Sequence, residues 1–147
     1  MKIYQKGDKK LLNAWAFYDW ANSVYPLVIS TAIFPIYYGF ITESNKYIEF
    51  LGFNFKNTAL ISFVTALAFL VLVIITPILS GIADYTGMKK KFMKFFCFMG
   101  SIATISLYWF DIDNLTLGLV YYLFAMIGFW GSLVFYNSYL PEIAFEN

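Results

Sequence analysis

The chain has 147 residues and a formal net charge of +1, and 61% of its residues are hydrophobic while 13% are charged. Because a soluble domain is about 45–50% apolar and about 25% charged, this composition excludes a water-soluble globular domain and a disordered chain. The absence of arginine and histidine, with a single cysteine at Cys97, argues against nucleic-acid binding, histidine catalysis and most zinc sites. We therefore expect a membrane protein with no metal, no cofactor and no nucleic-acid partner.

Four apolar segments, separated by groups of charged residues, are candidates for membrane-crossing helices. Such a helix needs about 20 mostly apolar residues, and the third segment reaches that length if Lys91 and Lys94 extend toward the headgroups. A β-barrel is disfavoured because the run Leu67–Ile75 is continuously apolar, whereas barrel strands alternate. The predicted fold class is an all-α membrane protein, with four transmembrane helices at about 13–41, 58–82, 92–110 and 115–140.

Lysines are distributed unevenly over the two ends of these helices. The tail over residues 1–12 and the loop after the second helix hold eight of them, whereas the other two loops hold only Lys46 and Lys56. Cytoplasmic loops of membrane proteins carry the excess of lysine. We therefore expect a multi-pass protein of the cell membrane with both termini in the cytoplasm.

The first predicted helix carries a polar stripe that begins at Asp19. Asn22 and Ser23 follow at i+3 and i+4, and Pro26 and Ser30 continue the same face. An unpaired carboxylate is costly in hydrocarbon, so the stripe is expected to face a protein interior or an aqueous path. Pro26 cannot donate a backbone hydrogen bond to Asn22, so it is expected to kink the helix.

Two interpretations of this stripe remain open. In the first, Asp19, Asn22 and Ser23 line a path for a substrate or for protons. In the second, Asp19 lies near the headgroups, about 10 Å into the helix at 1.5 Å per residue, and pairs with Lys9 or Lys10.

The loop between the second and third helices has an unusual order of small, acidic and basic residues. The small residues Ser80, Gly81 and Ala83 would permit close helix approach. Asp84 is expected to accept hydrogen bonds from the N-terminus of a neighbouring helix, and Gly87 permits a positive φ in a tight turn. The lysines that follow are expected to contact the anionic inner leaflet. An ordinary lysine-rich turn would explain these lysines but not the order Ala-Asp-x-x-Gly.

The fourth predicted helix combines small and polar positions. Gly128, Gly131 and Ser132 lie at i, i+3 and i+4, a spacing typical of close helix packing, with backbone hinging as the lesser alternative. Asn137 lies near the end of this helix. It is expected either to face the interior, as a further residue of the path, or to lie at the cytoplasmic interface.

The segment from Ser80 to Lys90 resembles the signature of the major facilitator superfamily, Gly-x-Leu-Ala-Asp-Arg-x-Gly-Arg-Arg, which joins the second and third helices. Ala83, Asp84, Gly87 and Lys89 fit this signature, whereas its first glycine, its leucine and two of its arginines are replaced. Two further segments, Trp15–Tyr25 and Phe135–Ala144, look like the first and fourth helices of the vacuole-effluxer-like branch of the superfamily.

The resemblance implies a secondary transporter built from two six-helix halves that rock around a central site. Its fungal members export amino acids from the vacuole, which implies a small amino-acid-like solute. We expect no enzymatic activity, because the loops are short and lack histidine, and no carboxylate pair with a nucleophile has a useful spacing. We expect residues 13–147 to form the N-terminal part of such a transporter, whose remaining C-terminal helices are the partners of Asp84 in the family. The alternative is a self-contained four-helix membrane protein that acts in assembly or as a subunit of an oligomeric small exporter.

Overall fold

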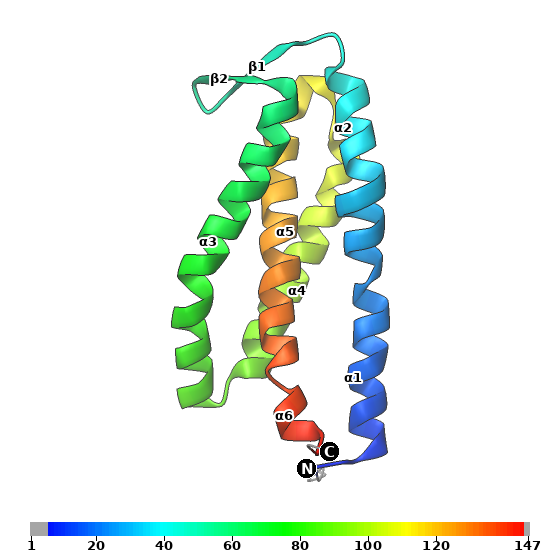
Figure 1. Cartoon of the computed structure of the whole chain (residues 1–147), viewed down its shortest axis with the longest axis vertical. Helices are drawn as coiled ribbons and strands as arrows, with labels where there is room; N and C mark the ends of the chain where they lie inside the picture. Colours follow the sequence, from blue (N-terminus) through cyan, green and yellow to red (C-terminus); the bar gives the residue numbers. More distant parts are fainter. Residues whose placement is uncertain (1–5, 146–147) are drawn as a thin grey trace.

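Four long helical spans form an elongated bundle in the computed structural model, which describes residues 6–145 (Figure 1). All four are long and apolar enough to cross a membrane, and together they agree with the predicted fold class. Part of the predicted basic tail, residues 1–5 with Lys2, lies outside the described residues. The two ends of the described chain meet at one end of the bundle, where the Gly7 amide donates to the Ile143 carbonyl at 2.8 Å.

The first span differs from the single kinked α-helix that the sequence predicts. It consists of three consecutive helices, namely α1 (Lys9–Asn22), the π-helix η1 (Tyr25–Ile33) and α2 (Phe34–Thr42). Asp8 begins α1 earlier than expected because its carboxylate accepts from the Lys10 amide at 2.8 Å. The π-helix begins around Pro26, whose ring and missing amide disturb the α-helical hydrogen bonds. The Thr31 hydroxyl donates to the Pro26 carbonyl at 2.7 Å.

The remaining spans contain one long α-helix each, with short helical turns at the ends of two of them. The second span is α3 (Asn57–Thr86), and it continues four residues beyond the prediction, to the left-handed turn at Gly87. The third span is α4 (Lys89–Ser106) followed by the 3₁₀ turn η2 (Leu107–Trp109). The fourth span comprises η3 (Ile112–Asn114), α5 (Leu115–Asn137) and α6 (Leu140–Ile143).

A small β-hairpin between the first two spans was not predicted, because its alternating charges favour a solvated loop. Strand β1 (Tyr47–Phe50) pairs antiparallel with β2 (Phe53–Lys56). Leu51 and Gly52 both have positive φ angles, 51° and 82°, as the central residues of tight hairpin turns do. Phe50 is only 2% exposed, so the hairpin closes this end of the bundle as well as connecting two spans.

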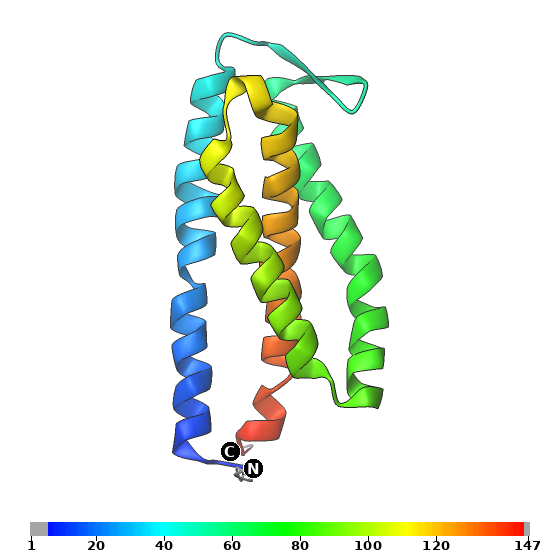
Figure 2. The same ribbon diagram turned by 180° about the vertical axis from the view of Figure 1, so that it is seen from behind.

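The core surrounds α5, which is the most buried of the helices. In the most apolar stretch of the fourth span, which contains α5, 56% of residues are buried, compared with 11% in that of the first span. Figure 2 shows α4 crossing obliquely over α5, and these two helices share the most extensive contact. At the crossing, a methyl group on Gly128 would clash with the backbone of Gly100. The α4–α5 crossing therefore depends on two glycines that bring the helix backbones together.

Candidate functional site

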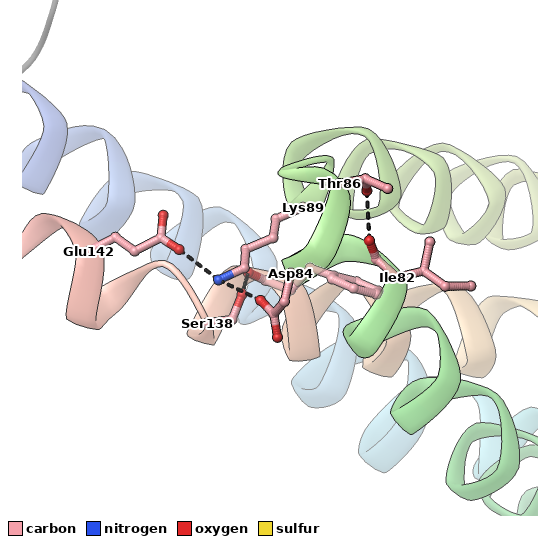
Figure 3. Close-up of polar contacts among 7 residues, drawn as sticks. Ile82, Asp84, Thr86, Lys89, Ser138 and Glu142 are labelled. Carbon is pink, nitrogen blue, oxygen red and sulfur yellow. Dashed lines mark hydrogen bonds and ion pairs between the residues drawn. The ribbon is translucent and has the colours of Figure 1, made fainter.

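A three-residue ion cluster joins the second, third and fourth spans at the end of the bundle where the termini lie (Figure 3). The Lys89 ammonium lies 2.9 Å from Asp84 Oδ1 and 2.6 Å from Glu142 Oε1. Lys89 begins α4, Asp84 belongs to the last turn of α3, and Glu142 lies in α6. The lysine side chain is 18% exposed, and the side chains of Asp84 and Glu142 are 63% and 50% exposed. One cation thus connects the ends of three spans.

The turn at Gly87 brings Lys89 back to Asp84. Gly87 has a φ of +66°, and the amides of Gly87 and Met88 both donate to the Ala83 carbonyl, which closes the end of α3. Asp84 was expected to accept hydrogen bonds from the N-terminus of a neighbouring helix; among residues 6–145 its carboxylate pairs with the side chain of Lys89. The turn places the lysine within reach, so the carboxylate has a full positive charge as its partner.

The small residues ahead of this turn differ in their surroundings. Ala83 is buried, with 1% of its surface exposed, and Ser80 is half-buried. Gly81 faces open space, because none of the described atoms would lie within 4 Å of a methyl group placed there. Of the expected close helix contacts, those at Gly81 are therefore not formed within residues 6–145.

A reciprocal pair of hydrogen bonds connects α1 to α5 near the same end. The Tyr136 hydroxyl donates to the Trp15 carbonyl at 2.9 Å, and the Trp15 indole N–H donates to the Tyr136 carbonyl at 3.4 Å. Their rings stack with centroids 4.7 Å apart and planes inclined by 10°. Trp15 and Tyr136 belong to two of the three segments that carry the family resemblance. Glu142 and Lys89 connect one of these to the signature loop, so all three segments meet at one end.

The polar stripe of the first span divides between two faces. Asn22 lies on the same face as Trp15 and Tyr18, at i+7 and i+4, and it lines a cavity. Asp19 and Ser23 lie further round the helix and are exposed; the Ser23 hydroxyl donates to the Trp20 carbonyl at 2.7 Å. No ion pair joins Asp19 to Lys9 or Lys10 in the part of the chain that the structure describes.

The cavity beside Asn22 has a volume of about 380 Å³ and lies between the first span, α4 and α5. Its lining includes Tyr25 on η1, Ser101 and Thr104 on α4, and Ser132 on α5. Four buried polar atoms in this region of the first span have no hydrogen-bond partner among the described residues, namely Tyr18 Oη, Asn22 Nδ2, Tyr25 Oη and Ser30 Oγ. Of these four residues, Asn22 and Tyr25 line the cavity, so it can offer neutral hydrogen bonds to water or to a small polar molecule.

Tyr25 was not among the candidate residues from sequence, although its spacing of i+3 from Asn22 on a helix would have indicated it.

The small residues of α5 lie in the core. Gly131 packs against the Phe96 ring, and the buried Ser132 hydroxyl donates to the Phe129 carbonyl at 2.8 Å. Asn137, the last residue of α5, is exposed.

No group of three or more side chains within residues 6–145 has the arrangement needed to hold a metal ion. The polar groups described above are hydroxyls, amides, three paired charges and the Asp19 carboxylate, which has no ion pair within residues 6–145. This set is suited to hydrogen bonding and ion pairing.

Comparisons with known proteins agree with the resemblance of these segments. The family model described as vacuole effluxer Atg22 like matches residues 7–147. The chain is 37% identical over 135 residues to an uncharacterized MFS-type transporter, YxiO, of Bacillus subtilis (strain 168). This match covers 91% of the chain and 30% of the relative, so the chain spans less than a third of that protein's length. No solved structure matches the chain. With four membrane-spanning helices and a family match over nearly its whole length, this chain is an integral membrane protein that belongs to the vacuole effluxer Atg22-like family of transporters.

Proposed function

We propose that this chain is the N-terminal part of a secondary transporter that moves a small, amino-acid-like solute across the cell membrane by alternating access. The observation that carries the proposal is the cluster of Lys89 with Asp84 and Glu142, within a chain that matches a transporter family. Rocking of one half of a transporter against the other requires helices that move as a unit. By joining the ends of α3, α4 and α6, Lys89 holds three spans together.

The remaining exposure of Asp84 supports a second role for this carboxylate. Lys89 engages Oδ1, and 63% of the side chain stays accessible to a further donor. In our proposal that donor belongs to the C-terminal helices of the whole transporter. The contact would then form and break as the two halves move.

We place this end of the bundle in the cytoplasm. Lysines gather here, at Lys6 and in the first turns of α1 and α4, whereas Lys46 and Lys56 flank the hairpin strands at the other end. The excess of lysine marks the cytoplasmic side of membrane proteins. Both termini are then cytoplasmic, as an even number of spans requires.

The proposed path for the solute or for protons includes Asp19, Asn22, Ser23 and Asn137. Asp19 supports this assignment because it is exposed and has no ion-pair partner in the described part of the chain, although it lies within a span. Such a carboxylate is costly against lipid, so it needs an aqueous path or a partner. Asn22 would contribute from the cavity side of the same helix turn.

Substitution of Asp19 tests this path. In proteoliposomes of the full-length protein, with a panel of labelled amino acids as solutes, Asp19→Asn should abolish uptake while the protein still inserts and folds. Asp113→Asn is the matched control, because it makes the same chemical change in an exposed turn of η3, and it should leave uptake unchanged. Unchanged transport by Asp19→Asn would remove this residue from the mechanism.

The ion cluster is tested by a second matched pair. Lys89→Gln removes both ion pairs, so we expect slower transport with little loss of expression. Lys91→Gln removes a nearby charge that forms no ion pair within residues 6–145, and transport should then stay near the wild-type rate. Equal rates for the two variants would contradict a role for the cluster in transport.

The alternative of a self-contained four-helix protein is not favoured by the family match. An antibody against the N-terminal tail, applied to membranes of the native cells, distinguishes the two. A band about three times the 17.0 kDa of this chain is expected for two six-helix halves. A band at 17.0 kDa would support the alternative.

A further inference from the structure

A second cavity lies at the lysine-rich end of the bundle and has a volume of about 250 Å³. Apolar and aromatic side chains from four helices line it, among them Leu11 of α1, Met93 of α4, Tyr136 of α5 and Ile143 of α6. Lys90 is the one charged residue among the described residues that line it. We refer to this space as the inner cavity. It combines an apolar wall with one positive charge.

The charge on Lys90 differs from that on its neighbour Lys89. Two carboxylates lie within 3 Å of the Lys89 ammonium, so that charge is compensated. Lys90 is exposed and forms no ion pair with any residue from 6 to 145. Lys91 points elsewhere, because its ammonium contacts the Met88 sulfur at 3.5 Å. This uncompensated cation at the inner cavity can therefore bind an anion.

The depth of the inner cavity suits a ligand with a polar head and an apolar tail. Its lining begins at Leu11, near the start of α1, and extends two helical turns along that helix to Tyr18. Because its one charged lining residue among those described is Lys90, at the start of α4, the apolar lining beyond it can take an acyl chain beneath a charged head.

We propose that the inner cavity binds one anionic phospholipid, with its phosphate on the Lys90 ammonium and an acyl chain against the wall formed by α1, α4, α5 and α6. Charge complementarity favours an anionic over a zwitterionic lipid, because the Lys90 ammonium has no carboxylate partner within residues 6–145. The apolar wall favours a lipid over a free anion. This proposal does not depend on transport activity.

The test measures lipid binding to the full chain in detergent. Phosphatidylglycerol should raise the midpoint of thermal unfolding and should remain as a bound adduct in native mass spectrometry. Lys90→Gln should lose most of both effects, whereas Lys91→Gln should keep them, because the two variants differ in position but not in charge. Phosphatidylcholine should give a clearly smaller shift.

A third variant fills the inner cavity while keeping every lysine. Ala14 lines it and is otherwise exposed, so Ala14→Phe should block the lipid adduct without disturbing the core. Should this variant not fold, the comparison of Lys90→Gln with Lys91→Gln decides alone.

Three results would overturn the proposal. An equal loss of the lipid adduct in Lys90→Gln and Lys91→Gln would mean that surface charge attracts the lipid without a specific site. Equal shifts of the unfolding midpoint with phosphatidylglycerol and phosphatidylcholine would show that the net charge of the lipid does not matter. The same shift from glycerol 3-phosphate would show that the site holds an anion without using its apolar wall.

Discussion

The contact between α4 and α5 and the contact of the first span with those same helices are built in different ways. At the α4–α5 crossing, Gly100 meets Gly128 and Gly131 meets the Phe96 ring, so backbones and rings approach without a gap. The first span contacts α5 through stacked aromatic rings, Trp15 on Tyr136 and Tyr25 on Phe129. Beside those rings lie cavities of about 250 and 380 Å³, and four buried polar atoms of the first span have no hydrogen-bond partner among the described residues.

This difference indicates which contacts are complete within the described chain. Small residues allow two helices in a membrane to gain close van der Waals packing, which needs no further partner. Large rings hold helices apart and leave space beside them. We therefore expect the α4–α5 crossing to carry stability, and the face of the first span to be the place where solute, lipid or further helices bind.

The largest expected effect comes from adding one methyl group at the crossing. Gly128→Ala places a carbon against the backbone of Gly100, so the helices must separate. We expect the free energy of unfolding to fall by about 1–3 kcal/mol. Unfolding in mixed micelles with increasing sodium dodecyl sulfate, followed by circular dichroism, measures this loss. Gly39→Ala is the control, because none of the described atoms lies within 4 Å of its added carbon. Equal effects would mean that the crossing is not closely packed.

Two serine substitutions make the comparison sharper. Ser132→Ala removes a buried hydrogen bond to the Phe129 carbonyl and should cost about 0.5–1.5 kcal/mol. Ser30→Ala removes a buried hydroxyl that has no partner in the described part of the chain, so stability should stay the same or rise. The same unfolding assay compares the two. A loss at Ser30 similar to that at Ser132 would show that this hydroxyl has a partner in the whole protein.

The smallest change in the free energy of unfolding is expected from removing a hydrogen bond between the first span and α5. Tyr136→Phe keeps the ring stacked on Trp15 but removes the bond to its carbonyl, and such bonds within membranes average about 0.6 kcal/mol. Tyr85→Phe is the control, because Tyr85 is 93% exposed. A loss larger than that of Gly128→Ala would reverse our ranking of the two contacts.

Hydropathy and charge predicted the number and approximate position of the spans, but not the details at their ends. The β-hairpin was missed because Glu49 and Lys56 look like solvated loop charges, although Phe50 between them is buried. The π-helix was missed because Pro26 predicts a disturbed helix without specifying the hydrogen-bond pattern that replaces it. Local sequence thus indicates the position of an interruption in regular structure more readily than the conformation that the chain adopts there.

What the sequence alone determined is that four helices cross a membrane, because long apolar runs can satisfy their backbone groups there only as helices. It also indicated the segments that carry the family resemblance. The tertiary structure decided which residues meet. Lys89 binds Glu142, 53 positions away, and Asn22 separates from Asp19 and Ser23. Such contacts depend on how each helix is rotated and how it crosses its neighbours, and a pattern of hydropathy along one helix does not specify either.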